Sequence, residues 1–166
     1  MAGELLTGAG AIFSIGTSTA ATIQSEFEAD TYTAIGELES IDEISRERNP
    51  VEFASLQDRR TRVARGVEAV SIISGTYAHD AADDGQAAMT LAYETVSLSA
   101  DNFNFRIQFA DGPGPDATTD GTTLYFRGPV LKLSLQSIDN QNVIRRAFSI
   151  ARNSEWIEVE SAASTA

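Results

Sequence analysis

The chain of 166 residues contains no cysteine, a single histidine and a single lysine. The lack of cysteine excludes disulfides, a thiolate nucleophile and cysteine-ligated zinc. With only His79, a multi-histidine metal site is excluded, and any serine–histidine–aspartate triad would have to use that residue. Long hydrophobic runs are also lacking. The first 24 residues have no basic start and are interrupted by glycines, so we expect neither a signal peptide nor a membrane anchor.

Basic residues are few: 12 against 24 acidic residues, which gives a net charge of −12. This balance argues against nucleic-acid binding, because a binder must neutralise phosphates with lysine and arginine. The length suits one domain, and such a domain buries about 70% of its unfolded surface. We therefore expect a single soluble domain over residues 1–166 that needs no metal or other cofactor.

Most of the chain has the period-two alternation of β-strands. Residues 31–41, TYTAIGELESI, predict one strand, and residues 66–74 predict the next. In residues 102–109, NFNFRIQF, apolar and polar side chains alternate strictly, which predicts a half-buried strand. Later strands are predicted over residues 122–135 (with a bulge or edge at Gly128-Pro129), 143–152 and 154–160.

One segment, about residues 81–97, has helical periodicity instead. Its apolar stripe comprises Met89, Ala92, Tyr93 and Val96. Asp80 is a candidate N-cap, and Asp83 and Asp84 fall in the first turn, where the helix dipole favours acids. This helix is expected to lie against a sheet.

The fold class is therefore mainly β (α+β), a β-sandwich or half-open barrel of about 7–8 antiparallel strands with one flanking helix. Residues 1–30 are expected to form an extended arm with a short strand at 11–15. Residues 42–62 are expected to form a long charged loop, and residues 161–166 a flexible tail.

Glu37 and Glu39 raise the question of catalysis. On a single strand they would share one face roughly 7 Å apart, a separation that fits glycosidases. Catalytic carboxylates, however, flank a substrate from different elements and need a cleft. Continuing the alternation, Ile41 and Glu43 join the same face. Three acids in four positions favour a solvated or pore-lining face over a catalytic pair.

Arginines are concentrated in and after the charged loop. They are Arg46, Arg48, Arg59, Arg60, Arg62 and Arg65. They could bind phosphate, or they could pair with carboxylates across a protein interface, which the bidentate geometry of arginine suits. The abundance of acids in other copies of the chain favours the interface.

The remaining candidates for chemistry are weak. His79 stands in a turn before the helix, where a loop or capping role is the more common one, and no Gly-x-Ser-x-Gly motif accompanies it. Asp83, Asp84 and Gly85 lack the other ligands of an EF-hand loop. Trp156 is expected to be an anchor in the core or at a subunit contact. The sequence thus offers no catalytic site, and we expect no enzyme.

The order of these features resembles siphophage major tail tube proteins over roughly residues 9–160. The likeness is carried by the segments GAGAIFSI, TYTAIGELESI, VEFASLQD, ARGVEAVSIISGTYAHDAADDGQAAM and GPVLKLSLQSIDNQNVIRRAFSI, in this order. The loop at 42–62 departs from the pattern, since it carries RERNP where glycines are expected. The wider group includes the tubes of contractile phages and of type VI secretion.

The resemblance implies a structural virion protein without enzymatic activity. It implies hexameric rings that stack into a hollow tail tube, with strands from each copy joined in one barrel around the lumen. The N-terminal region and the long loop would reach neighbouring copies, and double-stranded DNA would pass without specific binding. Implied partners are further copies and the tape-measure, terminator and distal-tail or initiator proteins. The implied location is the tail of a virus or gene-transfer agent, assembled in the host cytoplasm.

Under this resemblance Glu37, Glu39 and Glu43 are expected to line the lumen, where like charge would keep DNA sliding. The six arginines are expected at contacts between subunits or rings, facing acids such as those around residues 26–30. Three alternatives stay open: the tube of a contractile tail or secretion system, a monomeric β-sandwich that binds sugars or proteins, and a hydrolase using the carboxylates. A surrounding sheath would mark the first, an exposed aromatic platform the second and a pocket the third.

Overall fold

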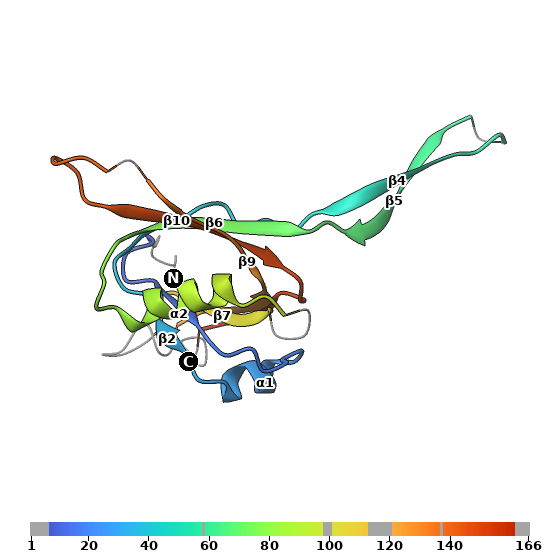
Figure 1. Cartoon of the computed structure of the whole chain (residues 1–166). Coiled ribbons are helices and arrows are strands. Elements are labelled where there is room, and N and C mark those ends of the chain that lie inside the picture. The colour runs from blue at the N-terminus through green and yellow to red at the C-terminus, as the bar shows by residue number, and fades with distance from the viewer. Residues whose placement is uncertain (1–6, 58, 98–100, 113–120, 137, 162–166) are drawn as a thin grey trace.

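The computed structural model describes residues 7–57, 59–97, 101–112, 121–136 and 138–161. Within these residues the chain forms two β-sheets packed face to face, a separate β-hairpin and two helices (Figure 1). The mainly β class with a flanking helix is therefore confirmed, although the described part has 11 strands and its sheets stay open. No helix of this part is long and apolar enough to cross a membrane.

The first sheet has five antiparallel strands in the order β11-β8-β7-β1-β2. Their bounds are β1 Ile12–Ile15, β2 Thr33–Ala34, β7 Phe103–Gln108, β8 Thr123–Gly128 and β11 Ile157–Val159. The second sheet has four antiparallel strands in the order β3-β6-β10-β9. Their bounds are β3 Leu38–Ile41, β6 Ser71–Ala78, β9 Val130–Leu135 and β10 Arg145–Arg152.

The core is a stack of aromatic rings between the two sheets. The ring of Phe13 on β1 lies 5.7 Å from that of Phe105 on β7 and 5.4 Å from that of Phe148 on β10, measured between centroids. All three side chains are almost fully buried. Helix α2, Asp84–Glu94, contacts β9 of one sheet and β1 and β2 of the other, so it bridges the layers.

Gly128 lets the chain pass from one sheet to the other. Residues 122–135, predicted as one strand with a bulge or edge at Gly128-Pro129, are two strands in different sheets, β8 and β9. A Cβ atom at Gly128 would overlap the carbonyl oxygen of Ala151, so the backbones approach more closely than any other residue permits. The hairpin of β9 with β10 and the terminal strand β11 are confirmed.

The single strand predicted over residues 31–41 is wrong. Strand β2 ends at Ala34 and pairs with β1, whereas β3 begins at Leu38 and pairs with β6 in the other sheet. Between them Glu37 has a positive φ of 57°, in the left-handed region that ends a strand. The Asp83 carboxylate accepts the Gly36 N–H at 3.1 Å and fixes this break.

The charged loop predicted over residues 42–62 is also a strand in large part. Strand β4, Arg48–Ala54, and strand β5, Thr61–Glu68, form a hairpin that projects from the body at the upper right of Figure 1. The strand predicted at 66–74 is in fact the end of β5 and the first half of β6. The break at residues 69–70 separates the hairpin from the four-stranded sheet.

The two helices differ from the sequence-based expectation in detail. The arm expected at 1–30 contains a short helix, α1, Gln24–Ala29, in addition to the strand. Helix α2 is capped by Asp83, whose carboxylate accepts the Gln86 N–H at 2.8 Å, and not by Asp80. In the predicted stripe Met89 and Ala92 are buried, but Tyr93 and Val96 are exposed. Residues 162–166 of the predicted tail lie outside the described residues.

Candidate assembly surface

One face of the four-stranded sheet is bare. Its inner face carries buried side chains such as Ile73, Tyr77 and Phe148, whereas no described helix or strand lies on the outer face, which points upward in Figure 1. Most outward positions are small or hydroxyl-bearing: Ser40, Ser74, Thr76, Ala78, Ser134, Ala147 and Ser149; Ile72 on β6, which is 55% exposed, is a bulky apolar exception. The Ser74 and Ser149 hydroxyls lie 3.1 Å apart. The centre of the bare face is therefore polar and built from small side chains.

Charge on the bare face is balanced in the structure. Arg145 on β10 donates from Nε to a carboxylate oxygen of Glu39 on β3 at 2.7 Å, across the intervening strand β6. Asp42 follows β3, and its N–H donates to the Ser74 carbonyl at 2.8 Å, which places Asp42 beside an outward residue. Lys132 on β9 is the register partner of outward-facing Ser149.

The three acids expected in one row are not brought together on one strand. Glu37 lies in the turn before β3, Glu39 lies at an irregularity within β3, and Glu43 follows the end of that strand. All three are exposed. The idea that they share one strand face is therefore wrong. Asp42, which was not singled out from the sequence, lies next to the bare face because the irregularity in β3 shifts the alternation by one residue.

Both outer strands of this sheet have a free edge. Strand β3 is paired only with β6, and strand β9 only with β10, within the described part of the chain. Neighbouring strands alternate in direction across the sheet, so the two outer strands run antiparallel to one another. A free edge presents unpaired N–H and C=O groups that can take up a further strand.

The β4–β5 hairpin pairs with no other described strand and has no core of its own. Every residue of β4 is exposed, including Val51 and Phe53, and Val63 on β5 is exposed as well. An isolated two-stranded hairpin is at best marginally stable in water. Exposed apolar side chains on a projecting element are typical of surfaces that another molecule covers.

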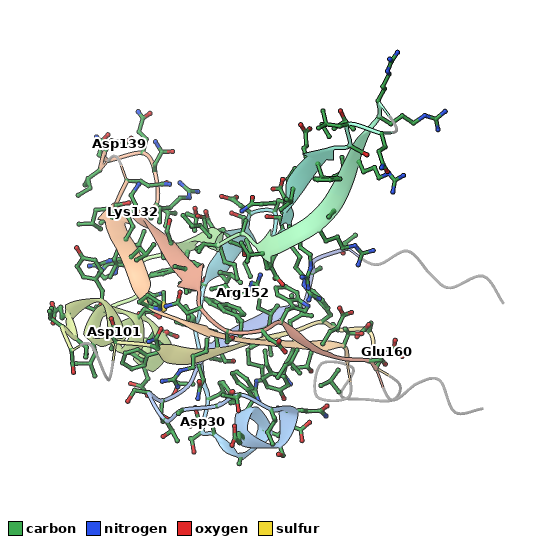
Figure 2. The ribbon with its side chains drawn as sticks, turned by 90° about the vertical axis from the view of Figure 1, so that its right-hand side faces the viewer. Asp30, Asp101, Lys132, Asp139, Arg152 and Glu160 are labelled. Carbon is green, nitrogen blue, oxygen red and sulfur yellow. The ribbon has the colours of Figure 1, made fainter. Side chains whose placement is uncertain are left out.

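The six arginines fall into two groups in the structure. Arg59, Arg60 and Arg62 lie in the far half of the hairpin, where nitrogen-tipped side chains gather at its tip in Figure 2, and Arg65, which pairs with Pro50, lies nearer its base. All four are exposed. Residues 48–68 hold five arginines and three acids, a net charge of +2, so that the rest of the chain carries −14. The hairpin is thus the basic end of an acidic molecule.

Arg46 and Arg48 belong to a cluster at the base of the hairpin. Their guanidinium groups lie 3.8 and 4.0 Å from the carboxylate of Glu68, which also accepts a hydrogen bond from Arg152. The bond from Arg152, together with the charges of Arg46 and Arg48, holds the pKa of Glu68 below its usual range against the opposing effect of burial. Arg152, labelled in Figure 2, is buried where the hairpin meets the body.

The acids around residues 26–30 have partners within their own chain. Burial would raise the pKa of Asp30, but hydrogen bonds from the Thr17 side chain and N–H and from Asn104 outweigh it and lower that pKa. The Glu26 carboxylate accepts the N–H of Thr22 at 2.7 Å, and its pKa is lowered chiefly by this bond. These contacts fix the N-terminal arm on the five-stranded sheet.

No arrangement for catalysis emerges among the described residues. An open hollow of about 740 Å³ lies between β3 and the five-stranded sheet, and Trp156 and Glu39 line it, but Glu37 does not. Trp156 also packs against the main core. His79 is exposed, and no group of three or more histidines and acids within the described residues could hold a metal. The carboxylates that accept a hydrogen bond from a threonine hydroxyl, Asp30, Asp111 and Glu26, do not line this hollow.

Comparison with known proteins identifies the fold through structure alone. Neither a family model nor a curated protein sequence matches the chain. Among solved structures, a chain of the PVC sheath/tube terminator of an extracellular contractile injection system is 12% identical with a TM-score of 0.69, covering 96% of this chain and 99% of that one. The chain has the tail-tube fold.

Two further structures show the same likeness. A chain from the tail of an empty gene-transfer-agent particle, refined with C6 symmetry, is 12% identical with a TM-score of 0.62 over 93% of this chain and 99% of that one. The SPP1 tail tube is 11% identical with a TM-score of 0.62 over 95% of this chain and 80% of that one. At these identities the likeness concerns the fold.

Proposed function

We propose that this chain is a structural subunit that assembles into hexameric rings, stacked as the hollow tail tube of a phage-like particle. DNA is delivered through the lumen to the host. Its partners are further copies of itself and the tape-measure, terminator and distal-tail or initiator proteins of the same particle. Its place is the virion tail, assembled in the host cytoplasm, and it catalyses no reaction.

The observation that carries this proposal is the four-stranded sheet with one bare face and two free edges. A rotation about an axis parallel to the strands keeps every strand direction. Because the sheet has four alternating strands, its outer strands β3 and β9 run in opposite directions. When one copy is rotated onto the next, β9 of the first therefore lies antiparallel to β3 of the second. Six copies pool 24 strands, well beyond the ~16 at which barrels enclose an aqueous channel. The bare faces would line that channel.

The surface chemistry suits transit of DNA. A bore lined mostly by small and hydroxyl-bearing side chains has few long side chains that could obstruct DNA. The carboxylate of Glu39 neutralises the charge of Arg145, so this arginine does not attract phosphates. The net charge of −12 per copy repels phosphates from the assembly as a whole. Glu37 and Glu43 add acids near the ends of β3. DNA therefore meets no strongly basic surface in the bore.

The basic hairpin supplies the second kind of contact. Its arginines and exposed apolar side chains project from a body that carries −14, so the hairpin of one copy is complementary to the body of another. Such a head-to-tail contact does not close on itself, and it generates filaments. Arg59, Arg60, Arg62 and Arg65 are the residues proposed to make it, while Arg46 and Arg48 hold the hairpin at its base.

Negative-stain electron microscopy of the purified chain over a range of concentrations, with light scattering alongside, tests the proposal. Hollow tubes or six-fold rings are expected, with scattering that rises above a threshold concentration. A chain that remains monomeric at every concentration, even after prolonged incubation that allows slow nucleation, contradicts self-assembly. In that case a monomeric binding module is favoured, and a screen for sugar and protein ligands replaces the assembly assay.

A second candidate is the terminator that caps such a tube. The PVC sheath/tube terminator has a higher TM-score, 0.69, than the gene-transfer-agent and SPP1 structures, at 0.62 each. A terminator forms single rings that stop growing, so rings without tubes would favour this candidate. Co-purification of a sheath from the native particle would instead favour the tube of a contractile system.

A further inference from the structure

The two free edges of the four-stranded sheet carry opposite charge. On and just after β3 lie Glu39 and Asp42, both acidic and exposed. On β9 the only charged residue is Lys132, the single lysine of the chain. Figure 2 shows Lys132 on the β9–β10 hairpin, on the same side of the molecule as Asp139. A sheet with acids at one edge and a lysine at the other is complementary in charge to a second copy of the same sheet.

Asp42 and Lys132 lie in one row across the bare face. The Asp42 N–H donates to the Ser74 carbonyl, Ser74 is the register partner of Ser149, and Ser149 is the register partner of Lys132. The row therefore begins with a carboxylate at one edge and ends with an ammonium group at the other. Residues that share a row across antiparallel strands have Cβ atoms about 4.5–5.5 Å apart from one strand to the next.

Neither charge is paired with a described residue of its own copy. Within the described residues neither side chain has a hydrogen-bond or ion-pair partner, whereas the neighbouring acid Glu39 is held by Arg145. Three strand spacings of about 4.8 Å separate the two ends of the row, so Asp42 and Lys132 of one copy are about 14 Å apart. They cannot meet except between copies.

We propose that Lys132 of one copy pairs with Asp42 of the next across the seam between β9 and β3. This inference rests on the proposed ring, and it assigns the seam contact and its register. In a ring whose strands run along its axis, the rotation that relates neighbouring copies keeps the height of each row, so the ammonium end of the row meets the carboxylate end of the same row. The seam then places one ion pair per interface on the face that lines the bore.

The edges of the other sheet do not offer the same contact. The five-stranded sheet has an odd number of alternating strands, so its outer strands β11 and β2 run parallel and would meet in the parallel sense. These strands are only three and two residues long. Thr33 on β2 and Glu158 on β11 therefore provide a matched control position at each edge.

Disulfide cross-linking tests the register, because the chain has no cysteine of its own. The double variant Asp42→Cys/Lys132→Cys, oxidised under conditions in which the wild type forms rings or tubes, is expected to give a ladder of covalent oligomers up to six copies on denaturing gels. The control Thr33→Cys/Glu158→Cys is expected to remain monomeric on the same gel. Within one copy the distance of about 14 Å far exceeds the roughly 7 Å that a disulfide spans between Cα atoms.

Charge reversal tests the ion pair itself. Lys132→Asp is expected to raise the threshold concentration for assembly about tenfold, because attraction becomes repulsion at both seams of each subunit. The exchange Lys132→Asp/Asp42→Lys is expected to restore the wild-type threshold. Failure of the exchange to restore assembly, or a wild type that assembles without a ladder from the cysteine pair, overturns the seam assignment. A wild type that never assembles instead refutes the proposed ring.

Discussion

Reversal of charge at the tip of the β4–β5 hairpin separates folding from assembly. The variant Arg59→Glu/Arg60→Glu changes the net charge of residues 48–68 from +2 to −2, against a remainder that carries −14. An exposed ion pair contributes about 0.2–1 kcal/mol, and a like-charge contact opposes association by a similar amount. Two reversals per subunit should therefore disfavour association by about 0.8–4 kcal/mol and raise the threshold concentration for assembly about 4- to 900-fold.

The assay is light scattering as a function of concentration, with electron microscopy to measure tube length. Both arginines are exposed and belong to a hairpin outside the core, so thermal unfolding of the body should not change measurably. The neutral variant Arg59→Gln/Arg60→Gln serves as the control and should give an intermediate threshold that is less sensitive to salt. Tubes of normal length at the wild-type threshold from the reversed variant would refute the assignment of the hairpin to a contact between copies.

Three further predictions concern the fold that holds these surfaces. Phe13→Ala removes the centre of the aromatic stack and should lower the free energy of unfolding in urea by about 3–5 kcal/mol; a loss below about 1 kcal/mol would contradict the role of the stack. Gly128→Ala forces a Cβ atom against the Ala151 carbonyl and should lower the melting temperature, whereas an unchanged one would show that the strand crossing tolerates a side chain. The pKa of Asp30 is lower in the folded than in the unfolded chain. The contribution of this carboxylate to the free energy of unfolding is therefore complete above the unfolded pKa of about 3.9, and it is lost as the pH falls through the folded pKa. Asp30→Asn should therefore lower the free energy of unfolding at pH 7 and weaken its dependence on pH below about 4. The same dependence on pH in the variant and the wild type would contradict this.

The parts of the fold that sequence reasoning identified are those in which apolar and polar side chains alternate. Strand β7 alternates Phe105 and Ile107 with the polar residues Asn104 and Arg106, and the β9–β10 hairpin follows the same rule. The break at Gly36 and Glu37 was missed because it depends on a left-handed residue held by Asp83 from a distant segment. The β4–β5 hairpin was missed because both of its faces are exposed, so no burial pattern marks it as strand.

One of the candidate surfaces could be predicted from the sequence and the others could not. The arginines around Arg59 and Arg60 are close together in the chain, so the basic cluster is visible in the sequence itself. The bare face could not, because it requires the order of strands in the sheet and the irregularity in β3 that places Asp42 beside Ser74. The cluster of Arg152 with Glu68 joins residues far apart in sequence, and no local signal indicates it.

The coreless hairpin has a consequence for how tubes begin. Ordering a peptide segment costs conformational entropy, and in a free subunit only the ion pairs at the base of the hairpin offset that cost, since every residue of β4 is exposed. That cost falls on the first few subunits to meet, whereas a subunit that joins an existing end finds a formed surface at once. Spontaneous nucleation is then slow and elongation fast, so the number of tubes in a cell follows the number of starting platforms and not the concentration of subunits.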